Sequence, residues 1–185
     1  MIGKKEKQGN WLRSIMIDDM EGEETLDKKE KQTVYLSASI ASGCQPCTKF
    51  HLRKSSEAGL SDVEINKTIA FALSIRNDAT RSMESFIHNH NTGNYIKEDK
   101  QESINRNGAL VGIATAYSVN FPSYLEKYLN IGRNSGISEG ELSEIIKISK
   151  SVIDMARAHV DMITDKIGIR QLGENKNDCC SSCDC

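Results

Sequence analysis

The same helix-start signal occurs twice in this 185-residue sequence, 77 residues apart. Ser61-Asp-Val-Glu64 follows Gly59, and Ser138-Glu-Gly-Glu141 follows Gly136. A serine followed three residues later by a glutamate is a capping box that opens a helix, and a glycine just before it is typical of the end of the preceding helix. Apolar positions on both sides match at the same offset. The sequence therefore predicts a duplicated unit of three helices.

Helices are predicted nearly everywhere else as well. The chain contains only two prolines, its apolar residues recur at helical spacing, and no run of alternating residues lies between hairpin turns. Two similar helical units bury their apolar faces best against each other, so we expect one all-α domain over 1–172, with halves of about 27–93 and 102–168. The polar segment 173–185 is predicted to be a flexible tail.

Charge and hydropathy exclude two classes of partner. The 24 basic and 26 acidic residues are interleaved and give a formal net charge of -2, so no basic stripe is available for nucleic acid. No stretch approaches the roughly 18 consecutive apolar residues of a membrane span, and the N-terminus has no apolar signal region. We therefore expect a cytoplasmic protein that binds neither nucleic acid nor membrane.

The six cysteines fall into two groups instead of being spread along the chain. The first group is the pair Cys44 and Cys47, and the second lies within the last seven residues: Cys179, Cys180, Cys183 and Cys185. In a protein without a secretory signal, this distribution indicates redox or metal chemistry in preference to structural disulfides.

Cys44-Gln-Pro-Cys47-Thr-Lys-Phe-His51 places two thiols and an imidazole on one face of a predicted helix. The pair lies at the N-terminal end of that helix, where free backbone N–H groups stabilise a thiolate. Cys47 is then the better placed nucleophile, and His51, one turn later, is its candidate base. At the 77-residue offset the equivalent positions are occupied by the aromatic residues Phe121, Tyr124 and Tyr128. We therefore expect one active half and one scaffold half.

Other interpretations of these residues remain open. The cysteine pair could be structural, or it could supply ligands to a zinc ion for which only three ligands are visible in the sequence. The four tail cysteines suit a soft metal ion such as Cu(I) or Zn(II), or a metalloid, and they could instead pass electrons to the pair or have no role. His88 and His90 are expected at a solvated helix end, and His159 in a core or an interface.

The stretch from Ala41 to His51, followed by Glu57-Ala-Gly-Leu-Ser-Asp-Val-Glu-Ile65, resembles the C-x-x-C-x-x-x-H and A-G-L-S-x-x-E-I signature of the AhpD-like alkylhydroperoxidase/carboxymuconolactone decarboxylase family. The resemblance implies an all-helical fold, assembly into trimers or hexamers, and no organic cofactor. It also implies reduction of a peroxide or a disulfide with electrons from a thiol reductant protein. On this basis Cys47 becomes the sulfenic acid, Cys44 closes the disulfide and His51 is the general base.

Gln32 stands where this family usually has a glutamate that relays protons with the histidine. A glutamine can hydrogen-bond but cannot take up a proton, so we expect disulfide exchange to be favoured over peroxidase turnover. Loss of a negative charge should also lower the thiolate pKa relative to a Gln32→Glu variant. The alternative functions are a soft-metal or metalloid binding protein that uses the tail cysteines, and a carboxymuconolactone decarboxylase-like protein without redox activity. The decarboxylase branch lacks the paired cysteines, which favours the redox branch.

Overall fold

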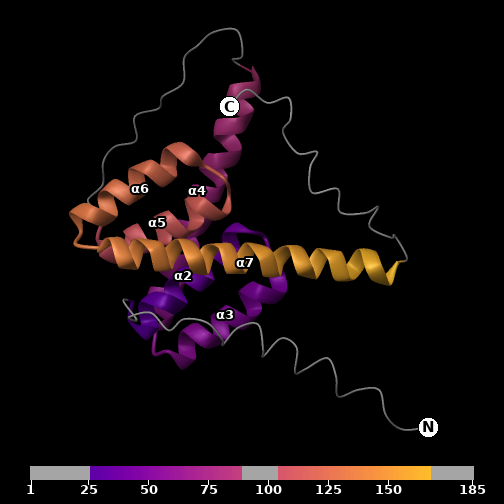
Figure 1. Cartoon of the computed structure of the whole chain (residues 1–185), viewed down its shortest axis with the longest axis horizontal. Coiled ribbons are helices and arrows are strands. Elements are labelled where there is room, and N and C mark those ends of the chain that lie inside the picture. Colours follow the sequence, from indigo (N-terminus) through magenta and orange to yellow (C-terminus); the bar gives the residue numbers. More distant parts are fainter. Residues whose placement is uncertain (1–25, 89–103, 168–185) are drawn as a thin grey trace.

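Six helices account for nearly all of the chain that the computed structural model describes, which is residues 26–88 and 104–167 (Figure 1). They are α2 Lys28–Ala41, α3 Gln45–Glu57, α4 Asp62–His88, α5 Arg106–Ser118, α6 Pro122–Asn134 and α7 Glu139–Lys166. No strand occurs within these two ranges. The predicted all-α fold is confirmed.

The helix bounds repeat at the offset seen in the sequence. Both ends of α3 and α6 are 77 residues apart, and so are the starts of α4 and α7. The turns repeat too, because Gly43 and Asn120 have φ of 72° and 54°, and Gly59 and Gly136 have φ of 90° and 78°. Glycine and asparagine are the residues that adopt this left-handed conformation most readily. The duplication is therefore present in the backbone as well as in the sequence.

The predicted capping signals form the expected hydrogen bonds. The Glu64 N–H donates to Ser61 Oγ at 3.3 Å, and the Ser61 N–H donates back to Glu64 Oε2 at 2.7 Å. Ser138 makes the same reciprocal pair with Glu141. Asp27 forms a capping box at the start of α2. These local contacts fix where three of the helices begin.

The core lies around α2 and α5, the first helix of each half. Helix α2 contacts α3, α4, α5 and α7, whereas α5 contacts α2, α4, α6 and α7. Several side chains of these two helices are completely buried: Val34, Leu36 and Ala38 on α2, and Leu110 and Ile113 on α5. Two helices surrounded on several sides need apolar residues on more than one face, which is why both are rich in small and branched side chains.

A partly buried network of ion pairs joins the two halves. The Arg106 guanidinium, at the start of α5, bonds Glu30 Oε1 of α2 at 2.8 Å and also bonds Glu141 of α7. These two hydrogen-bonded carboxylates hold the pKa of Arg106 above its ordinary value. Glu30 is thereby committed to Arg106 and is not available beside the dithiol.

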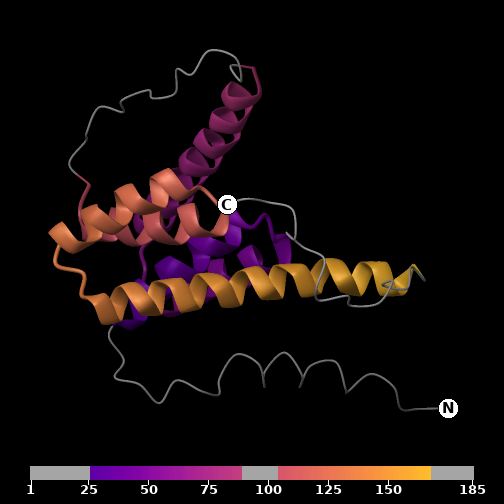
Figure 2. The same cartoon turned by 45° about the horizontal axis from the view of Figure 1, so that its top comes forward.

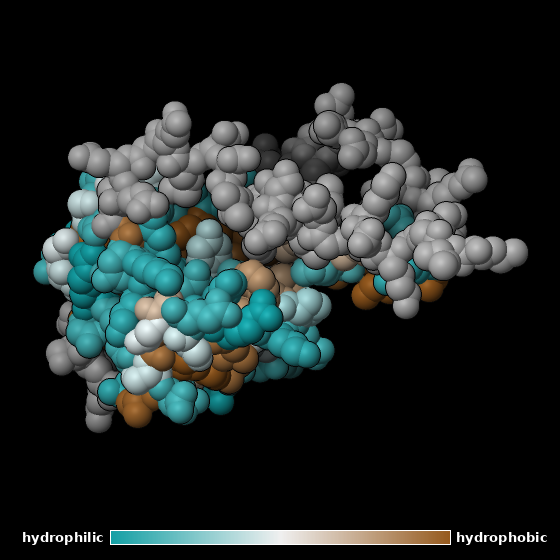
Figure 3. Space-filling model, turned by 90° about the horizontal axis from the view of Figure 1, so that it is seen from below, coloured by the Kyte–Doolittle hydropathy of each residue, from teal (hydrophilic) through white to brown (hydrophobic). Residues whose placement is uncertain are grey.

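The C-terminal parts of α4 and α7 project beyond the bundle in two different directions (Figures 1 and 2). Both projections carry exposed apolar side chains: Met83, Phe86 and Ile87 on α4, Val160, Met162 and Ile163 on α7, and Ile167 directly after it. Figure 3 shows apolar surface at the projecting end of α7. Within the described ranges, none of the helices has the length and apolar character needed to cross a membrane.

Candidate dithiol site

Cys44 and Cys47 form a disulfide at the start of α3. Cys44 is the N-cap residue, and its sulfur accepts a hydrogen bond from the Cys47 N–H at 3.2 Å. Pro46 occupies the first turn, where its missing N–H costs no helical hydrogen bond. The sulfurs therefore lie at the positive end of the α3 dipole, where backbone N–H groups stabilise developing negative charge.

The turn that delivers Cys44 to this position is held by α4. Gly43 has a φ of 72°, and a side chain there would meet the Arg76 guanidinium at 3.1 Å. Arg76 Nη1 donates to the carbonyl of Ile40, near the end of α2, at 2.8 Å. Glycine suits position 43 because a residue with a side chain would be strained at this φ and would have to displace the Arg76 guanidinium slightly. This contact fixes the direction in which the chain enters α3.

His51 lies two turns into α3 and is almost completely buried. Its ring stacks on Tyr35 of α2, with centroids 4.8 Å apart and planes 7° apart, and Phe50 packs edge-on against it at 5.1 Å. Burial lowers the pKa of His51 to about 4, so the ring is neutral near pH 7. Tyr35 shares this environment, and burial raises the pKa of its hydroxyl.

Gln32 and His51 are brought together as the resemblance implied. His51 Nδ1 is 3.4 Å from Gln32 Oε1. Because an amide oxygen only accepts, Nδ1 carries the proton in this arrangement and Nε2 keeps its lone pair. Among the described residues, His51 makes no hydrogen bond to either sulfur.

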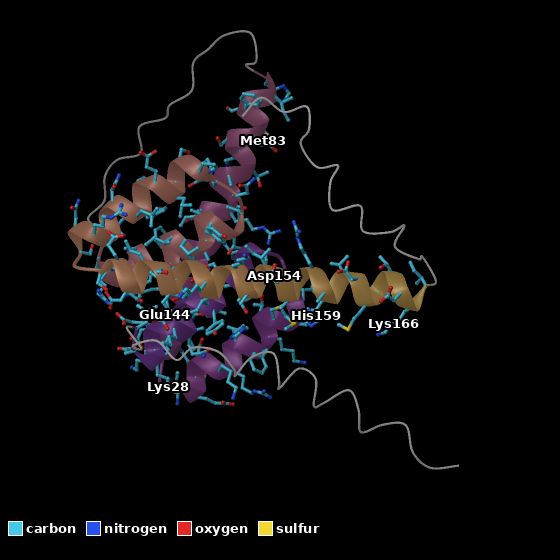
Figure 4. All side chains as sticks on the ribbon, in the orientation of Figure 1. Lys28, Met83, Glu144, Asp154, His159 and Lys166 are labelled. Carbon is cyan, nitrogen blue, oxygen red and sulfur yellow. A yellow bond between two sulfur atoms is a disulfide. The ribbon has the colours of Figure 1, made fainter. Side chains whose placement is uncertain are left out.

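The imidazole that contacts both sulfurs is His159, which sequence reasoning placed in a core or an interface. His159 lies on α7 where that helix passes over α3 (Figure 4). Its Nδ1 is 3.3 Å from Cys44 Sγ and 3.5 Å from Cys47 Sγ, and the residue is half-buried. The one signal in the sequence is that His159 follows the buried Val152 by seven residues, on the same face of α7. That spacing does not reveal which helix this face contacts.

The sulfurs are covered, although the residues between them are not. Cys44 and Cys47 are 7% and 5% exposed, whereas Gln45 and Pro46 are exposed to solvent. A hollow of about 600 Å³ begins at Ser42, next to this turn, and is bordered by α7. The hollow lies beside the pair, and neither cysteine lines it.

The second half shows which residues the equivalent helices pack where the cysteines and the histidine are replaced. At the offset of 77 residues, Tyr128 replaces His51, and Gly112 replaces the Tyr35 on which His51 stacks. A side chain at Gly112 would lie 2.3 Å from the Tyr128 ring, so one large ring fills the volume that Tyr35 and His51 share in the first half. Ala109 replaces Gln32. The polar site residues are thus not needed to pack this arrangement of helices.

The structure describes only some of the other residues that the sequence singled out. His90 lies outside the described residues, and so do the four tail cysteines: Cys179, Cys180, Cys183 and Cys185. His88 is exposed at the end of α4, as expected for a solvated helix terminus.

One family model matches the sequence, and its match covers the site. The model of the carboxymuconolactone decarboxylase family matches residues 10–82. None of the curated proteins matches this chain. The matched segment contains all of α2 and α3, with the dithiol between them. The resemblance seen in the C-x-x-C-x-x-x-H motif is confirmed by this match, which shows that residues 10–82 are similar to the carboxymuconolactone decarboxylase family.

Proposed function

We propose that this protein is a thiol–disulfide oxidoreductase of the AhpD-like kind, whose Cys44–Cys47 pair reduces a peroxide or a small disulfide. The observation that carries the proposal is the pair itself, placed at the N-terminus of α3 with an imidazole nitrogen within 3.5 Å of both sulfurs. Buried structural cysteines need neither the helix terminus nor the imidazole. The family match agrees with redox chemistry, but the family also includes decarboxylases. The proposal therefore rests on the geometry of the dithiol site.

The cycle begins with the pair reduced. The Cys47 thiolate attacks a peroxide oxygen, an S–O bond forms as the O–O bond breaks, and the leaving alkoxide takes a proton to become the alcohol. Cys44 then attacks the sulfur of the sulfenic acid, and the hydroxyl leaves as water with the Cys44 thiol proton. With a disulfide substrate, the same two attacks release two thiols. A thiol reductant protein returns two electrons and two protons to the pair.

We assign the direct proton exchange with the sulfurs to His159, in place of the role that the resemblance gives to His51. His159 Nδ1 lies at hydrogen-bonding distance from both sulfurs, whereas His51 forms its hydrogen bond with Gln32. His51 then acts as a neutral, buried group that sets the packing of α3 against α2. A His159→Gln variant should therefore raise the pKa of thiolate formation more than a His51→Gln variant does.

The test is a stopped-flow comparison of hydrogen peroxide, an organic hydroperoxide and a small disulfide. Wild type, Cys44→Ser, Cys47→Ser and a chain ending at Gly173 are mixed with each oxidant. We expect Cys47→Ser to lose reactivity, Cys44→Ser to stop after one oxidation, and the shortened chain to react normally. Reactivity that survives in Cys47→Ser would contradict the proposal. Loss of reactivity in the shortened chain would indicate that the tail cysteines react with the oxidant.

We also propose that the protein self-associates through the projecting ends of α4 and α7. Val160, Ile163 and Ile167 are each more than half exposed, which is unfavourable for clustered apolar side chains in water. The resemblance implies trimers or hexamers, and these projecting ends are the surfaces that such an assembly would cover. His159 precedes this apolar stretch on α7, so assembly would also restrict the helix that contacts the dithiol.

A further inference from the structure

Three metal-ligand atoms meet at the dithiol, and they come from two different elements. The Sγ atoms of Cys44 and Cys47 and a ring nitrogen of His159 all lie within 4.8 Å of one another. From this geometry we propose that the reduced pair and His159 form a binding site for a thiophilic metal ion of the zinc class, and that oxidation of the pair releases the ion. The proposal rests on the dithiol of the proposed function but not on its turnover.

The His159 imidazole already lies at the distance from both sulfurs that a metal ion bound by all three residues requires. In a tetrahedral site with Zn–S bonds of about 2.3 Å and Zn–N bonds of about 2.1 Å, a sulfur and a nitrogen ligand lie about 3.6 Å apart. The distances from His159 Nδ1 to the two sulfurs are 3.3 Å and 3.5 Å. Only the sulfurs must separate, and breaking the bond between them allows this. The ligand set therefore needs reduction and little rearrangement of the helices.

Charge and burial favour the same assignment. Two thiolates and a neutral imidazole neutralise a divalent cation, and soft sulfur ligands select zinc-class ions over calcium or magnesium. Both cysteines are less than a tenth exposed, so bulk water competes weakly for the ion. His51 is not the third ligand in this arrangement, because the ligand atoms that lie within 4.8 Å of one another belong to Cys44, Cys47 and His159. With three protein ligands, one tetrahedral position stays open to water or to an added thiol.

Metal binding and disulfide formation exclude each other, because both use the same sulfur electron pairs. When a peroxide oxidises the loaded site, the two thiolates lose two electrons and form the S–S bond, while the peroxide takes these electrons and two protons to give alcohol and water. The ion leaves because a disulfide is not a thiolate ligand. The bound metal should thus slow oxidation of the pair, and oxidation should release the metal.

The test uses the full-length chain with the four tail cysteines replaced by serine, so that the tail cannot bind the probe. The reduced protein is titrated with Co(II), whose sulfur-to-metal charge-transfer absorption reports thiolate ligation, and then with Zn(II) in competition. We expect one ion per chain, no binding by the disulfide form, and stoichiometric release on addition of hydrogen peroxide.

Variants identify the third ligand. We expect His159→Gln and His159→Ala to weaken Co(II) binding by at least the roughly 10–100-fold that loss of a supporting residue costs in other metal sites. His88→Ala, at an exposed position, should bind as the parent does. No charge-transfer band in the reduced parent, equal binding by the disulfide form, or unchanged binding in both His159 variants would each overturn the proposal. Peroxide turnover without metal binding refutes only this site, and metal binding without turnover refutes only the proposed function.

Discussion

Acidification should destabilise this protein through His51. Burial against Tyr35 and Phe50 lowers the pKa of His51 from its ordinary 6.5 to about 4. In the unfolded chain the same ring takes up a proton near its ordinary pKa. Between these two values the unfolded state binds more protons than the folded state, so the free energy of unfolding falls as the pH falls.

The size of the effect follows from the two pKa values. A pKa difference of about 2.5 corresponds to about 3 kcal/mol of unfolding free energy, which is present above pH 6.5 and is lost as the pH falls to 4. This is a large part of the total for a domain whose stability is on the order of 5–15 kcal/mol. Carboxylates also titrate in this range, so the contribution of His51 must be isolated by comparison.

The assay is urea unfolding at several pH values from 7.5 to 4, with the dithiol held in one redox state. A His51→Phe variant keeps a ring beside Tyr35 but cannot titrate, and His88→Gln serves as a control at an exposed position. Wild type and the His88 variant should both lose about 3 kcal/mol more than His51→Phe between pH 6.5 and pH 4. Parallel curves for wild type and His51→Phe would refute the argument that burial keeps this imidazole neutral.

Three further predictions concern residues around the site and the projecting helices. Gln32→Glu should raise the pKa of His51, because a carboxylate would replace an amide oxygen 3.4 Å from Nδ1, and it should also raise the thiolate pKa. NMR titration and thiol alkylation against pH measure the two values. Gly112→Ala should lower the unfolding free energy by about 1–3 kcal/mol or more, because the added carbon would lie 2.3 Å from the Tyr128 ring. Thermal and urea unfolding check this, and an unchanged midpoint would mean that α5 and α6 separate without cost. Ile163→Glu should shift the protein towards monomer in light scattering, since it places a charge within the exposed apolar end of α7; an unchanged mass would place the interface elsewhere.

Most of the fold could be predicted because its signals are local. The capping boxes at Ser61 and Ser138 and the left-handed glycines at 59 and 136 act within one or two turns, so a sequence pattern shows them directly. The position of the cysteine pair at the start of α3 is equally local. The contact between Gln32 and His51 is not, and it was expected only because a family resemblance relates the two positions.

His159 could not be assigned from the sequence for a physical reason. It lies 115 residues after Cys44 and reaches the sulfurs only because α7 crosses α3 at one particular place along its length. The crossing depends on how both helices pack against the two central helices, α2 and α5, and no spacing within α7 encodes it. A buried Val152 seven residues earlier indicates that this face of α7 points inward, but not what it meets.

The position of His159 changes what the duplication means. Aromatic residues at 121 and 124 replace the cysteines in the second half, which by itself suggests one active half and one scaffold half. The structure shows that the second half supplies the imidazole that contacts both sulfurs. At the equivalent place in the first half stands Ser82, so neither half holds both the cysteines and this histidine. The two copies have therefore diverged in complementary ways, and the one dithiol site in the described part of the chain depends on the packing of both halves.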